Sequence, residues 1–205
     1  AFYSDISVNQ PSLSNAEQLW GKELSYNNIM DADAALDLIM EFEKPACVIL
    51  KHSNPCGAAQ SEKSLAEAYK NAFNVDATSA FGGIVGLNRT MDADTAHAIG
   101  DVFTEVVIAP DYTQEALDIL TRKKNIRLLR VPEISQGRSA KKPLLFTRRV
   151  TGGLLLQDRD LGDVDLEKAK VVTKRAPSKD EMEALKFAWK IVKYVKSNAV
   201  IYATK

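Results

Sequence analysis

The sequence is poor in the side chains that form disulfides or bind metals, with two cysteines and two histidines in 205 residues. The two thiols, Cys47 and Cys56, are too few for a disulfide framework in a chain of this length, which predicts a cytoplasmic setting. A surplus of charge is also lacking, because 27 Lys and Arg residues balance 27 Asp and Glu residues. Nucleic-acid-binding proteins carry a basic surplus or stripe, so we expect no nucleic-acid partner.

Long hydrophobic runs are missing as well. No apolar stretch approaches the roughly 20 residues that span a bilayer, and the start "AFYSDISVNQ" lacks the layout of a signal peptide. We therefore expect no membrane partner. A content of 45% hydrophobic and 26% charged residues is typical of a globular protein with one core or two small lobes. The last residues, "SNAVIYATK", have the composition of a strand with no turn signal after it, which indicates a piece of a longer protein.

Helical and strand patterns alternate along residues 1–131. Helices are expected at 31–42, 64–73, 92–103 and 113–124, and strands at 46–50, 83–87, 106–109 and 126–131. Asp31 or Asp33 is the expected cap of the first helix, and Ser64 with Glu67 forms a capping box before the second. The strand at 46–50 shows no polar alternation, which predicts cover on both faces. The alternation favours an α/β layered sheet with right-handed crossovers.

Residues 132–142 are polar and punctuated by proline and glycine, which is typical of a loop. Two strands, "LLFTRRV" and "GGLLLQ", follow and are joined through Thr151 and Gly152. Ser178 and Glu181 form a second capping box, which opens a long helix. These patterns divide the chain into candidate sub-lobes 1–131 and 143–205.

Lys51 and His52 stand at the carboxyl end of the strand expected to be buried. In open α/β sheets this end borders the crevice where ligands bind. A lysine there can hold an anion, and a histidine can move a proton near neutral pH because its ordinary pKa is about 6.5. The residues that follow, Asn54-Pro55 and Cys56-Gly57, predict a turn that presents the pair. A plain surface pair at a strand end is the alternative.

A zinc site of the nucleoside-deaminase type does not fit this stretch. That site needs H-x-E followed by P-C-x-x-C, whereas Asn54 stands where the glutamate is required and no second cysteine follows Cys56. His97 has the spacing of a helix-face residue. We therefore expect no bound metal.

Three further positions have both a structural and a ligand-binding interpretation. Gly82 and Gly83 follow Phe81, and paired glycines form a turn or let a backbone approach a ligand closely. Asn198 lies where a helix ends, and Asn28 lies where one begins, so both are candidate caps. Their amides also suit recognition of a carboxamide or hydroxyl group. The pattern alone leaves these alternatives open.

Seven segments together resemble a known family. They are "LSYNNIMDADAAL", "ACVILKHSNPCGAA", "DATSAFGGIVGLNR", "EVVIAPDYTQEAL", "TGGLLLQDRDLG", "VVTKRAPS" and "KSNAVIYA". In this order they resemble the AICAR transformylase domain of the bifunctional purine biosynthesis proteins that also carry IMP cyclohydrolase. The resemblance covers nearly the whole chain and implies a cytidine-deaminase-like α/β fold without zinc, here the N-terminal part of that domain (residues 1–205).

The resemblance implies formyl transfer from 10-formyltetrahydrofolate to the 5-amino group of AICAR, within a cytoplasmic homodimer. His52 matches the histidine that takes the proton from the amine, and Lys51 matches the lysine that stabilises the oxyanion or protonates the leaving folate nitrogen. Asn198 matches the asparagine that orients the carboxamide and the formyl group. The implied AICAR-binding positions are Asn28, Phe81 and Gly82. Glu105 stands outside the implied catalytic set.

Two other hypotheses remain beside formyl transfer. An arginine-bearing run of the family would precede Ala1, and a glutamine-rich segment and the C-terminal tail would follow Lys205. The cyclohydrolase domain has no counterpart in this sequence. The chain by itself could therefore be a folded but inactive module that retains only structure or self-association. A zinc nucleoside deaminase is the third hypothesis, and the ligand count argues against it.

Overall fold

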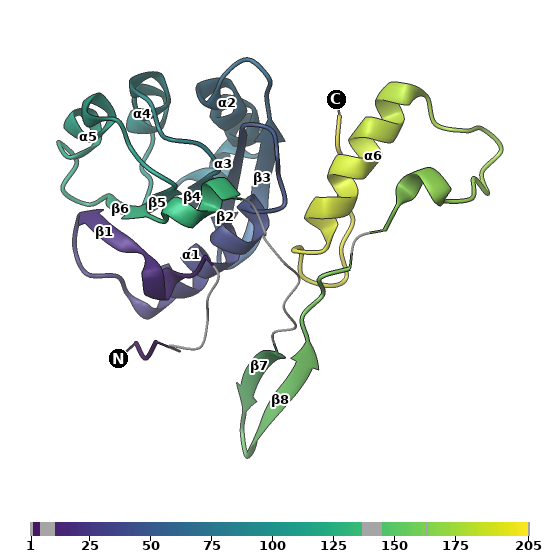
Figure 1. Cartoon of the computed structure of the whole chain (residues 1–205), viewed down its shortest axis with the longest axis horizontal. Coiled ribbons are helices and arrows are strands. Elements are labelled where there is room, and N and C mark those ends of the chain that lie inside the picture. The colour runs from purple at the N-terminus through teal and green to yellow at the C-terminus, as the bar shows by residue number, and fades with distance from the viewer. Residues whose placement is uncertain (1, 5–10, 137–144, 163, 205) are drawn as a thin grey trace.

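The computed structural model describes residues 2–4, 11–136, 145–162 and 164–204. Its centre is a six-stranded mixed sheet in the order β1-β6-β5-β4-β2-β3 (Figure 1). The strands are β1 (Glu17–Trp20), β2 (Ala46–Lys51), β3 (Asn54–Gln60), β4 (Ile84–Leu87), β5 (Val106–Ala109) and β6 (Arg127–Arg130). The predicted α/β class is confirmed. The sheet is parallel only from β4 through β5 to β6, whereas β1, β2 and β3 pair antiparallel to their neighbours.

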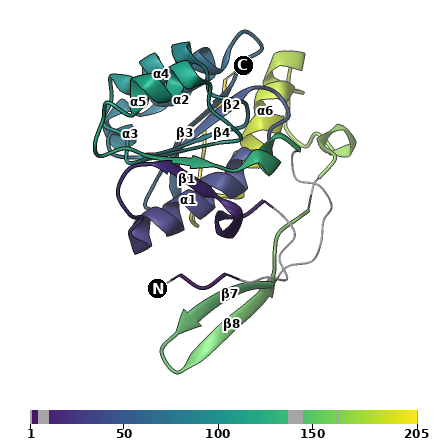
Figure 2. The ribbon, with the colours of Figure 1, turned by 60° about the vertical axis from the view of Figure 1, so that its left-hand side comes forward.

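Helices cover both faces of this sheet (Figure 2). One face carries α2 (Leu65–Val75), α4 (Ala93–Gly100) and α5 (Gln114–Leu120), with the short α3 (Ala77–Ala80) beside them. The opposite face carries α1 (Tyr26–Ile39), which packs against β2, β4 and β5. The fold is thus a three-layer arrangement whose sheet is buried between the two helical layers.

The side chains of β2 show how the layers are held together. Cys47 and Ile49 point into the core beneath α2, α4 and α5, whereas Val48 and Leu50 point into the core beneath α1. Successive side chains of a strand alternate between its faces, so an unbroken apolar run fills two cores at once. The expectation of cover on both faces of this strand is confirmed.

The predicted turn at Asn54–Gly57 is wrong, because those residues form the start of β3. The turn lies two residues earlier, at His52 and Ser53, and Lys51 pairs directly with Asn54 across it. Pro55 fits the strand because β3 is at the edge of the sheet, where a missing N–H breaks no ladder. Proline and glycine, which often mark turns, here belong to an edge strand.

Gly57 is required by close packing rather than by a turn. A Cβ atom at this position would lie 2.0 Å from the carbonyl oxygen of Ala72 in α2. The absence of a side chain therefore lets β3 and α2 approach one another.

Helix starts follow capping chemistry, with two corrections to the predictions. α1 begins five residues before the predicted start, and Ser25 with Asn28 forms its capping box, so neither Asp31 nor Asp33 is its cap. Ser64 caps α2 as predicted, but the Glu67 side chain bonds Ser61 and Lys63 rather than completing the box. The Ser-x-x-Asn box lies before Asp31 and Asp33, the acidic residues on which the prediction was based. Asparagine can serve at the third position of the helix because its amide oxygen accepts a hydrogen bond.

The predicted helices at 92–103 and 113–124 are shorter in the structure. α4 ends at Gly100 and α5 ends at Leu120, each with its predicted start preserved through the caps Asp92 and Thr113. The expected strand at 126–131 is β6, within one residue at each end. The residues that were assigned to the last helical turns instead connect the helices to the next strands.

The C-terminal region forms a separate hairpin and then a helix that packs against the body. After the 3-10 helix Pro132–Gln136, part of the predicted loop at 132–142 lies outside the described residues. β7 (Leu145–Val150) and β8 (Gly153–Asp158) then form the predicted hairpin, which projects from the body (Figure 1). A 3-10 turn (Leu166–Lys168) precedes α6 (Lys179–Val192), which starts at the predicted Ser178–Glu181 capping box.

The strand expected in the last residues is wrong for the part that the structure describes. Residues 199–204 have no strand assignment. Among the described residues, no helix has the length and apolar character needed to cross a membrane.

Candidate functional site

The Lys51-His52 pair lies at the β2–β3 turn. The two residues between the paired Lys51 and Asn54 are His52 and Ser53, and both have φ of 55°. Positive φ at both central positions is the requirement of the type I′ hairpin turn, which Asn and Gly usually fill. The turn therefore holds a non-glycine backbone in the left-handed region. It places the exposed His52 side chain beyond the end of a buried strand.

Two charged residues from distant parts of the sequence hold this turn. The carboxylate of Asp31 accepts hydrogen bonds from the backbone N–H of His52 (3.1 Å) and from the hydroxyl of Ser53 (2.8 Å). From the other direction, the Lys196 ammonium donates to the carbonyl oxygen of His52 at 2.7 Å. The two polar groups of the His52 backbone are thus bonded to opposite charges.

Lys51 connects the turn to the paired-glycine segment. Its Nζ donates to the carbonyl oxygen of Phe81 at 2.9 Å. The Phe81 ring is more than half exposed and lies 5.4 Å from the ring of Phe103, centroid to centroid. The N–H of Gly82, which has φ of 72°, donates to the Phe103 carbonyl at 2.8 Å. The structure therefore brings together Lys51, Phe81 and Gly82, which are three of the candidate site residues.

Asn198 lies two residues after Lys196, in the segment that follows α6. The backbone N–H of Lys196 donates to Oδ1 of Asn54 at 3.0 Å, which docks this segment on the hairpin. Ser197 Oγ then donates to Oδ1 of Asn198 at 3.1 Å. Asn198 is exposed. The predicted catalytic residues thus come from two segments, about 145 positions apart, that join at one turn.

Asn28 has a different environment from the other candidates. It is 4% exposed, its Oδ1 accepts from the N–H and the hydroxyl of Ser25, and its Nδ2 donates to Glu105 at 2.6 Å. Glu105 also donates its backbone N–H to the Gly83 carbonyl at 3.1 Å. Asn28 therefore completes the capping box of Ser25 at the start of α1, and through Glu105 it is linked to the glycine pair beside Phe81.

The two thiols, Cys47 of β2 and Cys56 of β3, both have raised pKa values. Burial raises the pKa of Cys56 to about 11, with a smaller contribution from the charge of Asp76. Burial also raises the pKa of Cys47 far above its ordinary range. Thiolates are the metal-binding and nucleophilic form of cysteine. In the part of the chain that the structure describes, no three His, Cys, Asp or Glu residues gather as a metal site would require.

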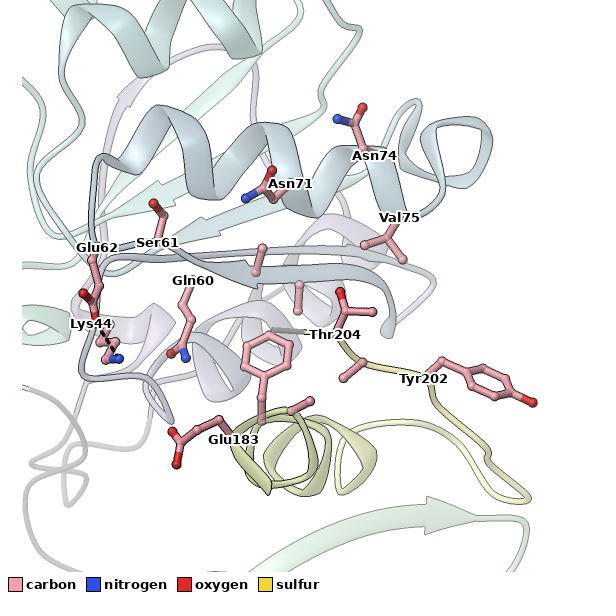
Figure 3. Close-up of a pocket in the computed structure, with 15 residues that line it drawn as sticks. Lys44, Gln60, Ser61, Glu62, Asn71, Asn74, Val75, Glu183, Tyr202 and Thr204 are labelled. Carbon is pink, nitrogen blue, oxygen red and sulfur yellow. Dashed lines mark hydrogen bonds and ion pairs between the residues drawn. The ribbon is translucent and has the colours of Figure 1, made fainter. Parts of the chain in front are cut away.

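A groove of about 660 Å³ lies away from the turn. It runs between α2, the second half of β3 and α6, with Gln60, Asn71 and Glu183 among its lining residues (Figure 3). The Tyr202 side chain points outward from it. The groove borders the end of β3 opposite to the turn, and neither Lys51 nor His52 lines it. We assign the candidate site to the turn because the chemistry-bearing side chains gather there.

Sequence reasoning missed three residues at this site. Asp31 was a predicted helix cap and Glu105 stood outside the implied catalytic set, while Lys196 occurred only within the quoted segment "KSNAVIYA". Asp31 lies in the second turn of α1, 21 positions before His52, so no spacing within one element connects the two residues. Lys196 precedes Asn198 in the motif "KSN", which was the available signal.

Together the fold and the site define a class: an α/β domain that presents a lysine and a histidine, suited to proton transfer and to binding negative charge, at the end of its sheet. The chain belongs to the AICARFT/IMPCHase bienzyme family, whose model matches residues 1–205. The resemblance drawn from the sequence motifs is confirmed.

Three curated relatives carry the name bifunctional purine biosynthesis protein PurH. The protein of Magnetococcus marinus is 53% identical over 204 residues, which cover 99% of this chain. The protein of Ruegeria pomeroyi is 53% identical and that of Roseobacter denitrificans is 52% identical, each over 205 residues. This chain spans 38% of the length of each of these relatives.

Proposed function

We propose that the chain is the N-terminal part of an AICAR transformylase domain and supplies its Lys-His pair. The whole protein would transfer a formyl group from 10-formyltetrahydrofolate to the 5-amino group of AICAR during IMP biosynthesis, and would also carry IMP cyclohydrolase. The family match over residues 1–205 supports this proposal, and so do relatives that are named for bifunctional purine biosynthesis. The six-stranded sheet with helices on both faces agrees with a cytidine-deaminase-like fold.

The reaction forms one bond and breaks another. The AICAR amine attacks the formyl carbon, a C–N bond forms, and the carbonyl oxygen gains negative charge. His52 accepts the proton that the amine loses, and Lys51 stabilises the oxyanion. The bond from the formyl carbon to the folate nitrogen then breaks, and the leaving nitrogen is protonated. Lys51 or the protonated His52 supplies that proton, so the proton count balances.

The 5-amino group of AICAR is a weak nucleophile because its lone pair is delocalised into the imidazole ring of AICAR itself. Removal of its proton by His52 would offset this weakness. General acid–base catalysis contributes roughly 10²–10⁴ in rate. A donor placed for a developing oxyanion contributes a similar factor, because removing one such donor costs about 10²–10³. The observation that carries the proposal is the joining of Lys51, His52 and the Asn198 segment at one turn, through the bonds from Lys196 to His52 and Asn54.

Substrate recognition would use the surroundings of the turn. We propose that the exposed Phe81 ring and the Gly82 backbone contact AICAR, and that Asn198 orients its carboxamide. Asn28 would act by holding Glu105 rather than by direct contact, because both ends of its amide are already bonded within the protein. A cytoplasmic homodimer of the whole protein is part of the same proposal.

A second candidate is that the chain alone is folded but inactive. It spans 38% of the length of its relatives, and apolar side chains of β7 and β8 are exposed, including Phe146, Leu154 and Leu156. Both observations favour a site that needs further protein to be complete.

The test is formyl transfer from 10-formyltetrahydrofolate to AICAR, measured by the absorbance of the tetrahydrofolate released. We expect the full-length protein to be active and His52→Ala to lower kcat by at least about 10². His97→Ala is the matched control, because His97 is the other histidine and is exposed on α4.

Equal activity of the His52→Ala and wild-type proteins would remove His52 from the proposed role. Comparison with the 205-residue chain alone separates the two candidates. An inactive chain beside an active full-length protein would show that the rest of the protein completes the site.

A further inference from the structure

The β2–β3 turn holds two adjacent residues in a conformation that side chains disfavour. His52 and Ser53 both have φ of 55°. A non-glycine residue is disfavoured in this region, so the conformation persists only where surrounding contacts fix it. Neither residue is glycine, and the turn therefore depends on contacts from outside the hairpin.

The Asp31 carboxylate provides two of those contacts through separate oxygens. Oδ2 accepts from the backbone N–H of His52 and Oδ1 accepts from the hydroxyl of Ser53. Hydrogen bonds to an ionised group are roughly twice as strong as neutral ones. One side chain thus fixes both left-handed residues at once.

Asp31 itself is held by a rigid element. It lies on α1 next to Ala32, which has no exposed surface, and α1 packs on β2. The helix also carries the capping box of Ser25 and Asn28 at its start. The position of the carboxylate relative to the end of β2 is therefore set by the packing between the helix and the sheet.

We propose that Asp31 is a positioning residue for His52. By fixing the backbone of the turn, it directs the His52 imidazole toward the reacting amine, and it does so without touching the substrate. This inference rests on the proposed function, in which His52 is the base. Misplacement of a reacting group by about 1 Å can cost on the order of 10² in rate, so a loosened turn is expected to lower kcat strongly.

The experiment uses the full-length protein and the formyl-transfer assay. We expect Asp31→Ala to lower kcat by about 10- to 100-fold and to change KM for AICAR by less than about 3-fold, since the effect is on placement of the base. Asp31→Asn keeps one acceptor oxygen and should lose less activity. Ser53→Ala removes the hydroxyl partner and should also lose less.

A double variant supplies the readout that a purely structural role would not give. If Asp31 acts through His52, adding Asp31→Ala to His52→Ala should lower the residual kcat no further. A general loss of structure would lower it by the same factor as in the wild-type background. Asp118→Asn is the matched control, because its oxygen accepts from Gln114 on an exposed helix surface far along the chain. Far-UV circular dichroism checks the folding of each variant. If Asp31→Ala does not fold, the single variants Asp31→Asn and Ser53→Ala are combined with His52→Ala in its place.

The outcomes separate this inference from the proposed function. An inactive His52→Ala beside Asp31→Ala and Ser53→Ala proteins with wild-type kcat would overturn the positioning role alone. Equal losses from Asp31→Ala in the wild-type and His52→Ala backgrounds would also overturn it. A fully active His52→Ala protein would refute the role of His52 first, and the positioning role with it.

Discussion

The body of the molecule, residues 13–134, and its C-terminal region, residues 145–204, use apolar side chains in different ways. In the body, apolar residues of both helical layers and of the sheet pack into two cores with almost no exposed surface. In the described part of the C-terminal region, Ile191 of α6 is the one buried residue, and it packs into the second of these cores. Leu154, Leu155 and Leu156 of β8 are each 57% or more exposed.

The C-terminal region is nevertheless tied to the body at defined points. The Glu41 carboxylate accepts from Lys193 at 2.8 Å and from the Tyr194 hydroxyl at 2.5 Å. Arg159 forms an ion pair with Asp37. A two-stranded hairpin is at best marginally stable by itself in water, and contiguous exposed apolar surface marks interaction sites. Among the described residues, the buried apolar side chains therefore lie almost entirely in the body, whereas the hairpin exposes an apolar surface of the kind that a protein partner covers.

The largest expected difference in unfolding free energy comes from shortening a leucine to alanine in each region. Leu128→Ala removes a fully buried side chain from β6, and the cavity should cost about 3 kcal/mol of unfolding free energy. Leu155→Ala in the exposed face of β8 should change it by less than about 0.5 kcal/mol. Urea denaturation followed by circular dichroism measures both. Equal costs would show that the hairpin is part of the same cooperative core.

A smaller loss is expected from overpacking the body at Gly57. Gly57→Ala places a Cβ against the Ala72 carbonyl, so β3 and α2 must separate, at a cost of about 1–3 kcal/mol. Gly100→Ala is the control, because a Cβ there meets nothing within 4 Å. Urea midpoints measure both variants. A Gly57→Ala protein as stable as the wild type would mean that the two elements are free to move apart.

The smallest effect concerns acid and the start of α6. Hydrogen bonds from Arg175, and then from the Ser178 backbone, lower the pKa of Glu181 from 4.5 to about 2. A lowered pKa means that the carboxylate stabilises the folded helix fully above pH 4.5 and loses this effect as the pH falls toward about 2. Fluorescence of Trp189, in a Trp20→Phe background, should follow the loosening of α6. Glu181→Gln should flatten the curve in that window, and an unchanged curve would contradict the assignment.

Much of the fold could be predicted because local signals and tertiary contacts agree. The apolar run of β2, the Ser64 and Ser178 caps and the Thr151–Gly152 turn each have one physical interpretation, and the structure confirms them. β1 and β3 were missed. β3 contains Pro55 and Gly57, which disfavour strands in general but are tolerated at a sheet edge and against a close helix.

The candidate site could be predicted in part for a related reason. Lys51 and His52 are adjacent in sequence, so their pairing was visible before the structure. The contacts that place them were not, because Asp31 and Lys196 reach the turn across 21 and 144 positions of the chain. Spacing along one element predicts which residues share a face, but it does not predict which distant side chain a turn will bind.

One strand, β2, supplies side chains to both cores, ends at Lys51 and is followed directly by His52. Both helical layers therefore pack against the strand that carries the pair, so neither layer can move this strand without disturbing its packing against the other layer. A change in the packing of either layer is expected to alter the position of the Lys-His pair. A compensating change in one layer alone is not expected to restore that position. We expect adaptation of this site to a different substrate to proceed through the loops around the end of β2, because a shift of the strand would disturb both cores at once.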